Sequence, residues 1–326
     1  MKVAIAGCGL IGQKRLRALG KGHELVIAAD TNLERAEALV RQRDGALATD
    51  DWRKAVSHSS VDAVIVATTN QWLAPITLAA IQAGKHVLVE KPGAITPGEL
   101  DPVLDAAKKT GRQVSVGFNH RFHPAMQKAR EIFESGALGS LMFVRGRYGH
   151  GGRVGYDKEW RADPKISGGG ELIDQGVHLI DLARWFLGDF KHVSGFANTY
   201  FWDMPVDDNA FLSLRTKDNQ MAWLHVSCTE WKNLFSFEIY GRDGKLHLEG
   251  LGGSYGPERL TYYRMLPEMG PPETTSWEYP GDDKSWQREW EAFVGNIERG
   301  GDLTSGLENA RAVLCVVSEV YRGSGL

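Results

Sequence analysis

The sequence predicts two domains: an α/β domain with a doubly wound parallel sheet over residues 1–120, and an α+β domain over residues 121–326. Three observations support this. A chain of 326 residues is long for one hydrophobic core. Up to about residue 120, short apolar segments alternate with helical patterns, which is typical of parallel strands joined by helices. Beyond residue 121, strand-like segments follow one another across short polar turns, which indicates an open, mostly antiparallel sheet flanked by helices.

The first domain is predicted from continuous apolar runs, which are typical of strands buried on both faces of a sheet. Each run is followed by a segment with apolar residues at helical spacing. The predicted strands are 2–6, 25–29, 61–67, 86–89 and 113–117, and the predicted helices are 12–19, 33–43, 52–56, 72–83 and 99–110.

A glycine-rich turn joins the first strand to the first helix. Its pattern, G-x-G-x-x-G, lets the chain turn sharply and lets a pyrophosphate reach the N-terminus of the helix. Asp30, at the end of the second strand, would bind the adenosine ribose hydroxyls and repel a 2′-phosphate, so NAD is favoured. Arg35 lies close enough in sequence that NADP stays an alternative cofactor. The residues predicted to bind the cofactor at this turn are Gly7, Gly9, Leu10, Ile11, Gly12, Asp30 and Thr31.

Polar residues also follow three other predicted strands, and ligands of such sheets bind beyond the carboxyl ends of the strands. Lys91, fixed by Pro92, could hold its ammonium near the nicotinamide and polarise a carbonyl oxygen or share a proton with an alcohol. The alternative is an exposed loop lysine, the usual state of this residue type. The cofactor-binding residues predicted here are Thr68, Thr69, Asn70, Glu90 and Lys91, and the substrate-binding residues are Lys91, Asn119 and Arg121.

The stretch 168–178 contains three glycines and then a predicted helix that begins near Glu171. On an α-helix, Asp174 and His178 are four residues apart and share one face. A carboxylate beside an imidazole can orient the ring and support its protonated form, which a general base needs. The glycines remove side chains where a bulky group would approach the backbone. The alternative is a glycine cap before an ordinary amphipathic helix with a core histidine.

The second domain is predicted to contain a helix over 122–135 and a strand-rich region after it. Further strands are expected at 141–150, 192–201, 210–216, 221–228, 235–240 and 245–248, with irregular, proline-rich chain over 255–280 and helices at 284–299 and 307–321. Substrate contacts are expected from Lys91, Asn119, Arg121, Tyr148, His150, Trp160, Arg161, Asp174 and His178. For the aromatic residues, a place in the sheet core or at a subunit contact is the alternative.

Composition excludes several classes of protein. The formal net charge of −3 offers no electrostatic argument for nucleic acid or an anionic membrane, and no apolar run is long enough to span a bilayer. The three cysteines, Cys8, Cys228 and Cys315, form no C-x-x-C pair, so we expect neither disulfides nor structural zinc. With no recognisable signal peptide, a cytoplasmic location is expected, and no metal is expected in the active site.

Taken together, the motifs resemble those of the Gfo/Idh/MocA oxidoreductases, the glucose-fructose oxidoreductase and inositol dehydrogenase family. The matching segments are 7–12, 67–70, 83–92, 119–122 and 168–178. The resemblance implies a Rossmann domain followed by an α/β domain with an open sheet that commonly makes dimers and tetramers. It also places Lys91, Asp174 and His178 on the catalytic positions of the family. Leu73 and Thr69 depart from the residues that the family often has there.

The expected function is therefore hydride transfer between NAD and a secondary hydroxyl or ketone of a sugar, nucleotide sugar or cyclic polyol. In this hypothesis His178 removes the hydroxyl proton, Asp174 orients His178, and Lys91 stabilises the alkoxide. The alternatives are an NADP-dependent carbonyl or diol reductase of the same family, and a non-catalytic nucleotide-binding regulator. The resemblance also implies a homodimer or homotetramer formed through the C-terminal sheet.

Overall fold

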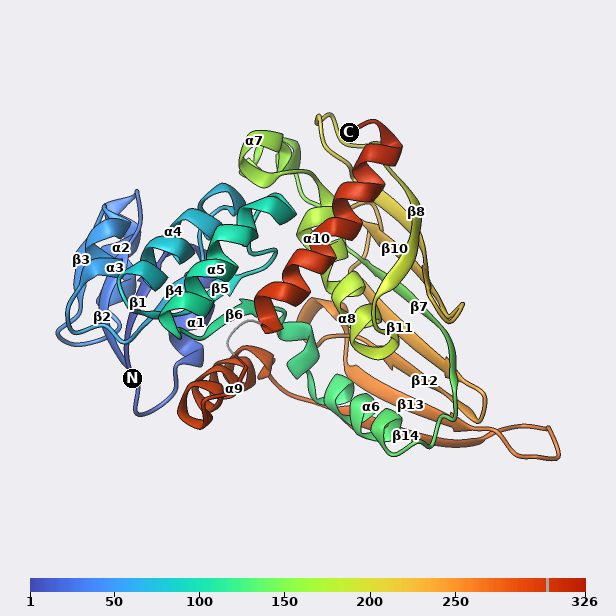
Figure 1. The fold of residues 1–326 in the computed structure, drawn as a ribbon. Coiled ribbons are helices and arrows are strands. Elements are labelled where there is room, and N and C mark those ends of the chain that lie inside the picture. Colours follow the sequence, from blue (N-terminus) through green and yellow to red (C-terminus); the bar gives the residue numbers. More distant parts are fainter. Residues whose placement is uncertain (303–304) are drawn as a thin grey trace. The chain divides into compact units, whose positions relative to one another are not determined.

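A computed structural model describes residues 1–302 and 305–326, which form two compact units (Figure 1). Unit 1 comprises Met1–Phe118, Lys165–Gly168 and Trp286–Leu314, and unit 2 comprises Asn119–Pro164, Gly169–Ser285 and Cys315–Leu326. The second half of the chain thus contributes to both units. This differs from the expected division at residue 120, which assigned 286–314 to the second domain.

Unit 1 is built on a six-stranded parallel sheet in the order β3-β2-β1-β4-β5-β6, the order of a dinucleotide-binding fold. This confirms the doubly wound prediction. Its strands are β1 (Lys2–Ala6), β2 (Glu24–Ala29), β3 (Leu47–Thr49), β4 (Ala63–Val66), β5 (His86–Glu90) and β6 (Val114–Gly117). Its helices are α1 (Leu10–Ala18), α2 (Leu33–Val40), α3 (Trp52–Ser57), α4 (Asn70–Gln82), α5 (Asp101–Thr110), the short α7 (Pro164–Ser167), most of α9 (Ser285–Arg299) and the first half of α10 (Ser305–Ser324).

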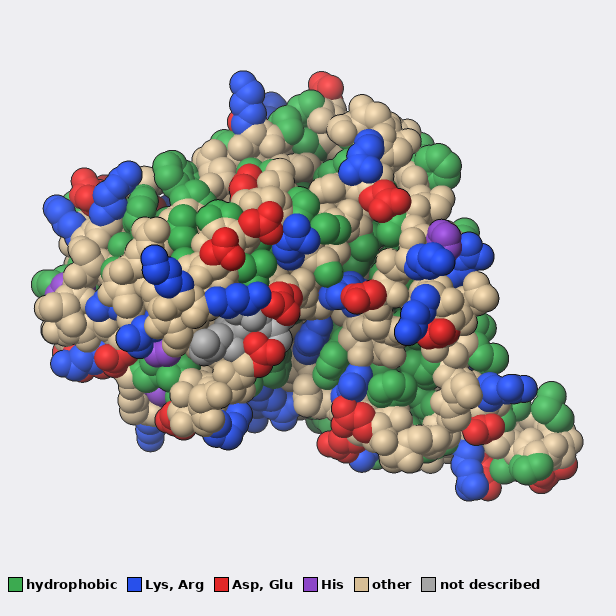
Figure 2. Space-filling model, viewed as in Figure 1, with side chains coloured by type: hydrophobic (Ala, Val, Ile, Leu, Met, Phe, Trp, Pro, Cys, Tyr) green, Lys and Arg blue, Asp and Glu red, His purple; other side chains and the backbone are tan. Residues whose placement is uncertain are grey.

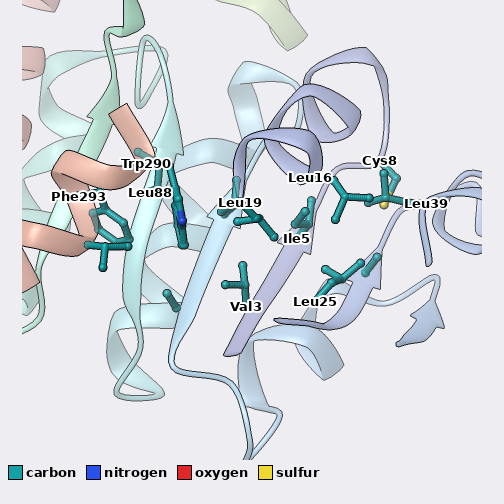
Figure 3. Close-up of a cluster of buried hydrophobic side chains, with 14 of the residues drawn as sticks. Val3, Ile5, Cys8, Leu16, Leu19, Leu25, Leu39, Leu88, Trp290 and Phe293 are labelled. Atoms are coloured by element: carbon teal, nitrogen blue, oxygen red, sulfur yellow. The ribbon is translucent and has the colours of Figure 1, made fainter. Parts of the chain in front are cut away.

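The core of unit 1 explains why the late helix α9 belongs to it. Apolar side chains of β1 and β5, among them Val3, Ile5 and Leu88, are fully buried because parallel strands are covered on both faces. Trp290 and Phe293 of α9, each 1 % exposed, join the same cluster (Figure 3). Burying one such side chain stabilises the folded state by about 1.5–3 kcal/mol. The amphipathic face of α9 is therefore completed by the nucleotide-binding unit.

Unit 2 is built on an eight-stranded sheet in the order β14-β13-β12-β11-β7-β10-β9-β8. The neighbouring strands are antiparallel except β7 and β10, which are parallel. This confirms the mostly antiparallel prediction. Its strands are β7 (Leu141–Gly149), β8 (Phe190–Asn198), β9 (Asn209–Thr216), β10 (Met221–Ser227), β11 (Leu234–Gly241), β12 (Gly244–Glu249), β13 (Glu258–Arg264) and β14 (Glu273–Tyr279).

Helices α6 (Pro124–Glu134) and α8 (Val177–Leu187) lie on the inner face of this sheet (Figure 1). Strand β7 alternates, so that Val144, Gly146 and Tyr148 are buried beneath the helices. A Cβ at Gly146 would lie 3.0 Å from Phe237 and 3.2 Å from Leu179, so glycine lets α8 approach the sheet closely. That approach positions the helix that carries the residues of the predicted active site.

Two predictions about unit 2 were wrong. The segment 255–280, expected to be irregular, contains the hairpin of β13 and β14. Strand β14 lies at the sheet edge with mostly exposed side chains, so it lacks the apolar alternation on which the prediction depended, and three of the prolines lie in the connecting loop. Strand β8 ends at Asn198, short of the expected residue 201. The Asp208 carboxylate accepts hydrogen bonds from the backbone N–H groups of Tyr200, Phe201 and Trp202, which holds these residues in a loop.

The described residues contain no helix that is both long and apolar enough to cross a membrane, and no group of His, Cys, Asp and Glu arranged to hold a metal. On the face shown in Figure 2, basic and acidic side chains are interspersed over each unit and do not gather by sign. This intermixing of the two signs agrees with the near-neutral charge of the sequence.

Candidate active site

The three glycines of the nucleotide turn have three different surroundings. Gly7 has a φ of +94°, and a Cβ there would lie 2.3 Å from the Ala67 carbonyl oxygen. A Cβ at Gly12 would lie 2.0 Å from the Gly7 carbonyl oxygen, so strand, turn and helix are packed backbone to backbone. At Gly9, by contrast, an added Cβ would meet no atom of the described chain within 4 Å. The turn is therefore closed toward the protein and open at the position where a pyrophosphate approaches.

Asp30 is tied to this turn. Its Oδ2 accepts a hydrogen bond from the Cys8 N–H (2.8 Å), and its Oδ1 accepts one from the Asn32 N–H (2.9 Å). Each carboxylate oxygen keeps a second lone pair for a ribose hydroxyl. Burial, with Asp30 beside it, raises the pKa of the Cys8 thiol to about 12, so Cys8 is a neutral packing residue. The open glycine and the anchored carboxylate fit NAD, with Leu10 exposed at the start of α1.

At the other strand ends the structure separates two kinds of residue. Thr69 is the N-cap position of α4, with Thr68 just before it, and both are partly exposed. Asn70 and Glu90 are instead buried: the Asn70 amide donates to the Ser167 carbonyl (2.7 Å), and the Glu90 carboxylate pairs with Arg15 (2.5 Å). Both side chains therefore make contacts inside unit 1. Lys91 is partly buried, and its peptide bond to Pro92 is cis.

In unit 2 the glycines before the predicted catalytic helix serve internal packing. A Cβ at Gly169 would lie 2.2 Å from the Tyr321 hydroxyl, and one at Gly170 would lie 1.9 Å from the Asp207 carbonyl oxygen. The bulky group that the glycines admit is thus part of the protein. Asp207 Oδ1 accepts from the Gly170 N–H (2.8 Å) and the Tyr321 hydroxyl (2.7 Å), and Oδ2 accepts from the Leu172 N–H (2.7 Å).

Asp207 therefore caps the start of this helix from a distant part of the chain. The side chain is fully buried, and burial raises the pKa of its carboxyl to about 6, although the bonds from Leu172, Tyr321 and Gly170 act in the opposite direction. The helix that was expected to begin near Glu171 is confirmed, with one difference: residues Leu172–Gly176 form a π-helical turn before α8. Such wide turns occur often at functional sites.

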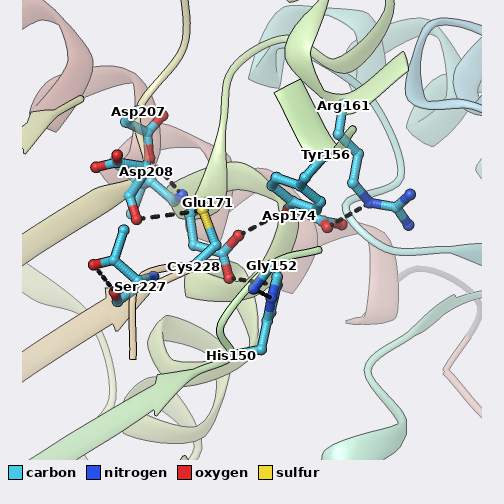
Figure 4. Close-up of polar contacts among 12 residues, drawn as sticks. His150, Gly152, Tyr156, Arg161, Glu171, Asp174, Asp207, Asp208, Ser227 and Cys228 are labelled. Atoms are coloured by element: carbon cyan, nitrogen blue, oxygen red, sulfur yellow. Dashed lines mark hydrogen bonds and ion pairs between the residues drawn. The ribbon is translucent and has the colours of Figure 1, made fainter. Parts of the chain in front are cut away.

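Asp174 and His178 lie on the π turn and on the first turn of α8, and they are 7 % and 4 % exposed. The Asp174 carboxylate accepts a hydrogen bond from Arg161 Nε at 2.9 Å (Figure 4). The His178 ring stacks on the His120 ring, with centroids 3.8 Å apart and planes 19° apart. The sequence spacing predicts a shared face on a continuous α-helix; in the structure the two side chains reach the interior across a π–α junction.

A second polar group lies beside this pair. Glu171 Oε2 accepts from the Tyr156 hydroxyl (3.3 Å), and its Oε1 lies 3.5 Å from His150 Nε2 (Figure 4). His150 Nδ1 accepts from the Gly152 N–H (2.9 Å), so the neutral ring carries its proton on Nε2 and directs it at Glu171. Burial lowers the pKa of His150, but the Glu171 carboxylate outweighs burial and the pKa is raised.

Of the remaining predicted substrate residues, some lie beside Asp174 and others make contacts elsewhere in unit 2. The Arg161 guanidinium, which pairs with Asp174, lies 4.5 Å from the centre of the Trp160 ring. Tyr148 is buried, and burial together with Tyr255 raises its pKa well above the ordinary value. Two other predicted substrate residues make side-chain contacts within unit 2. Asn119 donates its amide to Ser285 Oγ (2.8 Å), and Arg121 makes a two-bond pair with Asp181 (2.8 and 2.6 Å).

Several residues of this site were not predicted from the sequence: His120, Tyr156, Glu171, Asp207 and Tyr321. No motif marks Asp207 or Tyr321, because each acts through a partner far away in the chain; the two are 114 residues apart. Glu171 lies within the segment 168–178, and His120 lies within the segment 119–122. Its stacking on His178 is a tertiary contact that spacing does not indicate.

Comparison with known proteins places this geometry in context. A family model described as "Oxidoreductase family, NAD-binding Rossmann fold" matches residues 1–118, and one described as "GFO/IDH/MocA C-terminal domain" matches residues 126–247. Levoglucosan dehydrogenase of Pseudarthrobacter phenanthrenivorans is 33 % identical over 255 residues, covering 68 % of this chain and 63 % of that protein. D-glucoside 3-dehydrogenase of Escherichia coli is 26 % identical over 345 residues, covering 99 % of this chain and 95 % of that protein.

The fold is similar to that of solved structures as well. A levoglucosan dehydrogenase in complex with NADH and levoglucosan superposes with a TM-score of 0.88 at 24 % identity, over 99 % of this chain and 98 % of that one. At this level of identity the likeness establishes the architecture, and the chemistry rests on the residues.

Proposed function

This chain belongs to the GFO/IDH/MocA oxidoreductase family, and from that premise we propose that it reversibly oxidises a secondary hydroxyl of a sugar or sugar-like polyol. Unit 1 is an NAD-binding Rossmann domain. The observation that carries the proposal is the buried imidazole of His178 on the same helix as the buried Asp174 carboxylate. A buried histidine of this kind can take a proton from a substrate hydroxyl near neutral pH.

NAD supplies the hydride chemistry when bound, held by the 7–12 turn, by Asp30 and Thr31, and by Thr68 and Thr69. His178 accepts the hydroxyl proton. Asp174, paired with Arg161, supports the protonated imidazole by its negative charge. The Lys91 ammonium donates a hydrogen bond to the substrate oxygen and stabilises the negative charge that develops there. General-base help of this kind contributes about 10²–10⁴-fold to the rate.

The polar group around Asp174 supports a polyhydroxylated substrate. His150, Tyr156, Glu171 and Arg161 set donors and acceptors side by side within unit 2 (Figure 4). Trp160 offers an apolar ring face next to Arg161. Alternating hydroxyls and C–H faces are the chemistry of a sugar ring. The similarity to a levoglucosan dehydrogenase, to a D-glucoside 3-dehydrogenase and to inositol 2-dehydrogenases supports a sugar, a glucoside or a cyclic polyol as the substrate.

The test is an assay of NADH formation by the purified protein with NAD and a panel of sugars, glucosides, nucleotide sugars and inositols. With the best substrate, His178→Ala and Lys91→Met should each lower kcat by about 10²–10⁴-fold. Arg311→Met, in an exposed pair with Asp101, is the control and should retain activity. Turnover close to that of the unmodified protein in both active-site variants would remove the scheme.

We also propose that a second copy of the chain covers the face of the eight-stranded sheet that lies opposite α6 and α8. Cross-strand pairs share one face, and this face exposes Phe196 paired with Phe211 as well as Trp223, which is 58 % exposed. Phe143 stacks on Tyr240 in the same face, with ring centroids 4.2 Å apart. Exposed aromatic residues of this number indicate an interface.

The molar mass of the assembly, measured by light scattering as the protein elutes from a size-exclusion column, tests this proposal. A homodimer or homotetramer is expected, and Trp223→Glu should shift it to smaller species while Phe201→Glu, in a loop outside this face, should not. A monomeric protein would overturn this proposal and leave the proposed activity standing. The proposal extends to a cytoplasmic location, since the free thiols of Cys8 and Cys228 are buried unoxidised; recovery from an oxidising compartment after cell fractionation would oppose it.

A further inference from the structure

Unit 1 contains a buried ion network of three residues drawn from three elements. Arg15 of α1 is 1 % exposed, and its Nε and Nη2 lie 2.6 and 2.5 Å from Glu90 Oε1 at the end of β5. Its Nη1 donates to Glu289 Oε2 of α9 at 2.6 Å. Glu90 and Glu289 are themselves 7 % and 3 % exposed. One guanidinium therefore joins the nucleotide-binding helix, the strand that precedes Lys91 and a helix from the end of the chain.

Glu90 is held by its main chain as well as by its carboxylate. Its carbonyl oxygen accepts a hydrogen bond from the Gly93 N–H at 3.0 Å, which closes the turn over residues 90–93, and Glu90 is paired in register with Gly117 of β6. Lys91 is the next residue in the chain. The backbone from which the Lys91 side chain extends is thus anchored, through the Glu90 carboxylate, to Arg15.

Gly117 and Trp286 enclose the guanidinium on two further sides. A Cβ at Gly117 would lie 2.7 Å from Arg15 Nη2 and 3.1 Å from Glu90 Oε2, so only glycine on β6 leaves the pair its space. On another side the Trp286 ring packs on the guanidinium, with 4.5 Å from the ring centre to Cζ. A planar, enclosed guanidinium with fixed partners is well suited to hold one geometry.

Stability alone is a weak reason for such a network. Two carboxylates and one guanidinium are removed from water together, and apolar residues of similar volume are often as stabilising or more so in such positions. The location is more informative than the interaction energy. The network lies where the helix behind the glycine turn meets the turn that carries Lys91, so it ties the cofactor-binding element to the lysine.

We propose that Arg15 is a positioning residue for Lys91. Held by Glu289, Arg15 holds Glu90 and so fixes the 90–93 turn relative to α1, which aligns the Lys91 ammonium with the substrate oxygen. The inference rests on the proposed function, in which Lys91 contacts that oxygen. A lysine displaced by about 1 Å can lose about 10²-fold in rate, while binding of NAD at the glycine turn is affected little.

Kinetics with the best sugar substrate test the role. Arg15→Met should lower kcat by about 10–10²-fold and change the KM for NAD by less than about threefold, with partial recovery in Arg15→Lys. In a Lys91→Met background, Arg15→Met should have almost no further effect on kcat, because the residue on which it acts is absent. Arg311→Met serves as the control within the same unit. If Arg15→Met lowered kcat by the same factor in the unmodified protein and in Lys91→Met, Arg15 would have only a structural role and the proposal would be overturned.

A second readout is independent of turnover. Lysines can be labelled by reductive ¹³C-methylation, and the Lys91 resonance identified by its loss in Lys91→Arg. Arg15→Met should move or broaden the Lys91 resonance while Arg311→Met leaves it in place, with circular dichroism showing that both variants are folded. An unchanged Lys91 resonance in folded Arg15→Met would refute the positioning role. If the unmodified protein oxidises no sugar, the proposed function fails, and this spectrum still decides the claim about Arg15.

Discussion

At the scale of single residues, the site depends on buried charges whose partners come from distant parts of the chain. Asp207 is the clearest case, because its carboxylate makes three hydrogen bonds and none of them is to a neighbour in sequence. Burial nevertheless raises the pKa of Asp207 to about 6. The folded protein therefore holds this carboxylate at a cost, which depends on pH.

The sign of that dependence follows from linkage. The ordinary pKa of an aspartate is 3.8, so between about pH 4 and pH 6 the folded protein binds more protons at Asp207 than the unfolded chain does. The contribution of Asp207 to the free energy of unfolding is thus full below about pH 4 and is lost as the pH rises through about 6. The difference between the ordinary pKa of 3.8 and the pKa of about 6 in the folded protein corresponds to about 3 kcal/mol.

Urea unfolding of the unmodified protein and of Asp207→Asn checks this prediction. The stability of the unmodified protein relative to the variant should fall by about 3 kcal/mol between about pH 4 and pH 7. Tyr321→Phe removes a hydrogen bond that lowers the pKa of Asp207. In that variant the loss of stability with rising pH should therefore extend to higher pH. If the stability of the unmodified protein relative to Asp207→Asn stayed constant or increased with pH, the raised pKa of Asp207 would be contradicted.

At the scale of elements, the catalytic helix depends on close backbone contacts at its start. Gly170 lies between the Asp207 cap and the π turn that carries Asp174. A Cβ at Gly170 would lie 1.9 Å from the Asp207 carbonyl oxygen and 2.7 Å from the Asp207 backbone nitrogen. Backbone cannot move aside as a flexible side chain can, so the helix start itself would have to shift.

Gly170→Ala should therefore destabilise the protein by about 2–4 kcal/mol and lower kcat by at least about tenfold, since Asp174 and His178 would move with the helix. Thermal unfolding and steady-state kinetics measure the two effects. The matched control is Gly323→Ala in α10, where an added Cβ would meet no atom of the described residues within 4 Å. That variant should be stabilised by up to about 1 kcal/mol. Similar behaviour of the two variants would oppose the packing argument.

At the scale of the whole molecule, the nucleotide-binding unit is completed by chain from its far end. Trp290 and Phe293 of α9 are buried in one cluster with Val3 and Leu88 (Figure 3). Glu289 on the same helix pairs with Arg15. Residues 1–118 match the family model by themselves, but their hydrophobic core is not closed without α9.

Trp290→Ala should accordingly destabilise unit 1 by about 3–5 kcal/mol, as expected for removal of a fully buried aromatic side chain. NADH binding, followed by the fluorescence of the cofactor during urea unfolding, should be lost at lower urea than in the unmodified protein. Phe201→Ala, in an exposed loop of unit 2 outside the proposed subunit interface, is the control and should leave NADH binding unchanged. Loss of cofactor at the same urea concentration in all three proteins would show that α9 does not support this unit.

Much of this arrangement could be predicted from local pattern. The parallel strands appear as unbroken apolar runs, and the nucleotide turn as glycines at fixed spacing, because steric rules on a few adjacent residues determine both. The hairpin of β13 and β14 could not be predicted in this way, since an exposed edge strand needs no apolar alternation. The π turn at Leu172–Gly176 was missed for a related reason: helical spacing alone does not distinguish it from an α turn.

The sequence by itself determined most of the elements and the residue types at the ends of the strands, because backbone geometry and burial act over short stretches of chain. Only the tertiary structure decided what each polar residue does. Asn119 and Arg121 bond Ser285 and Asp181, and Asp207 and Tyr321, which no motif marks, hold the start of the helix that carries His178. The physical reason is that the orientation of a buried polar side chain depends on hydrogen-bond partners that folding brings from far along the chain.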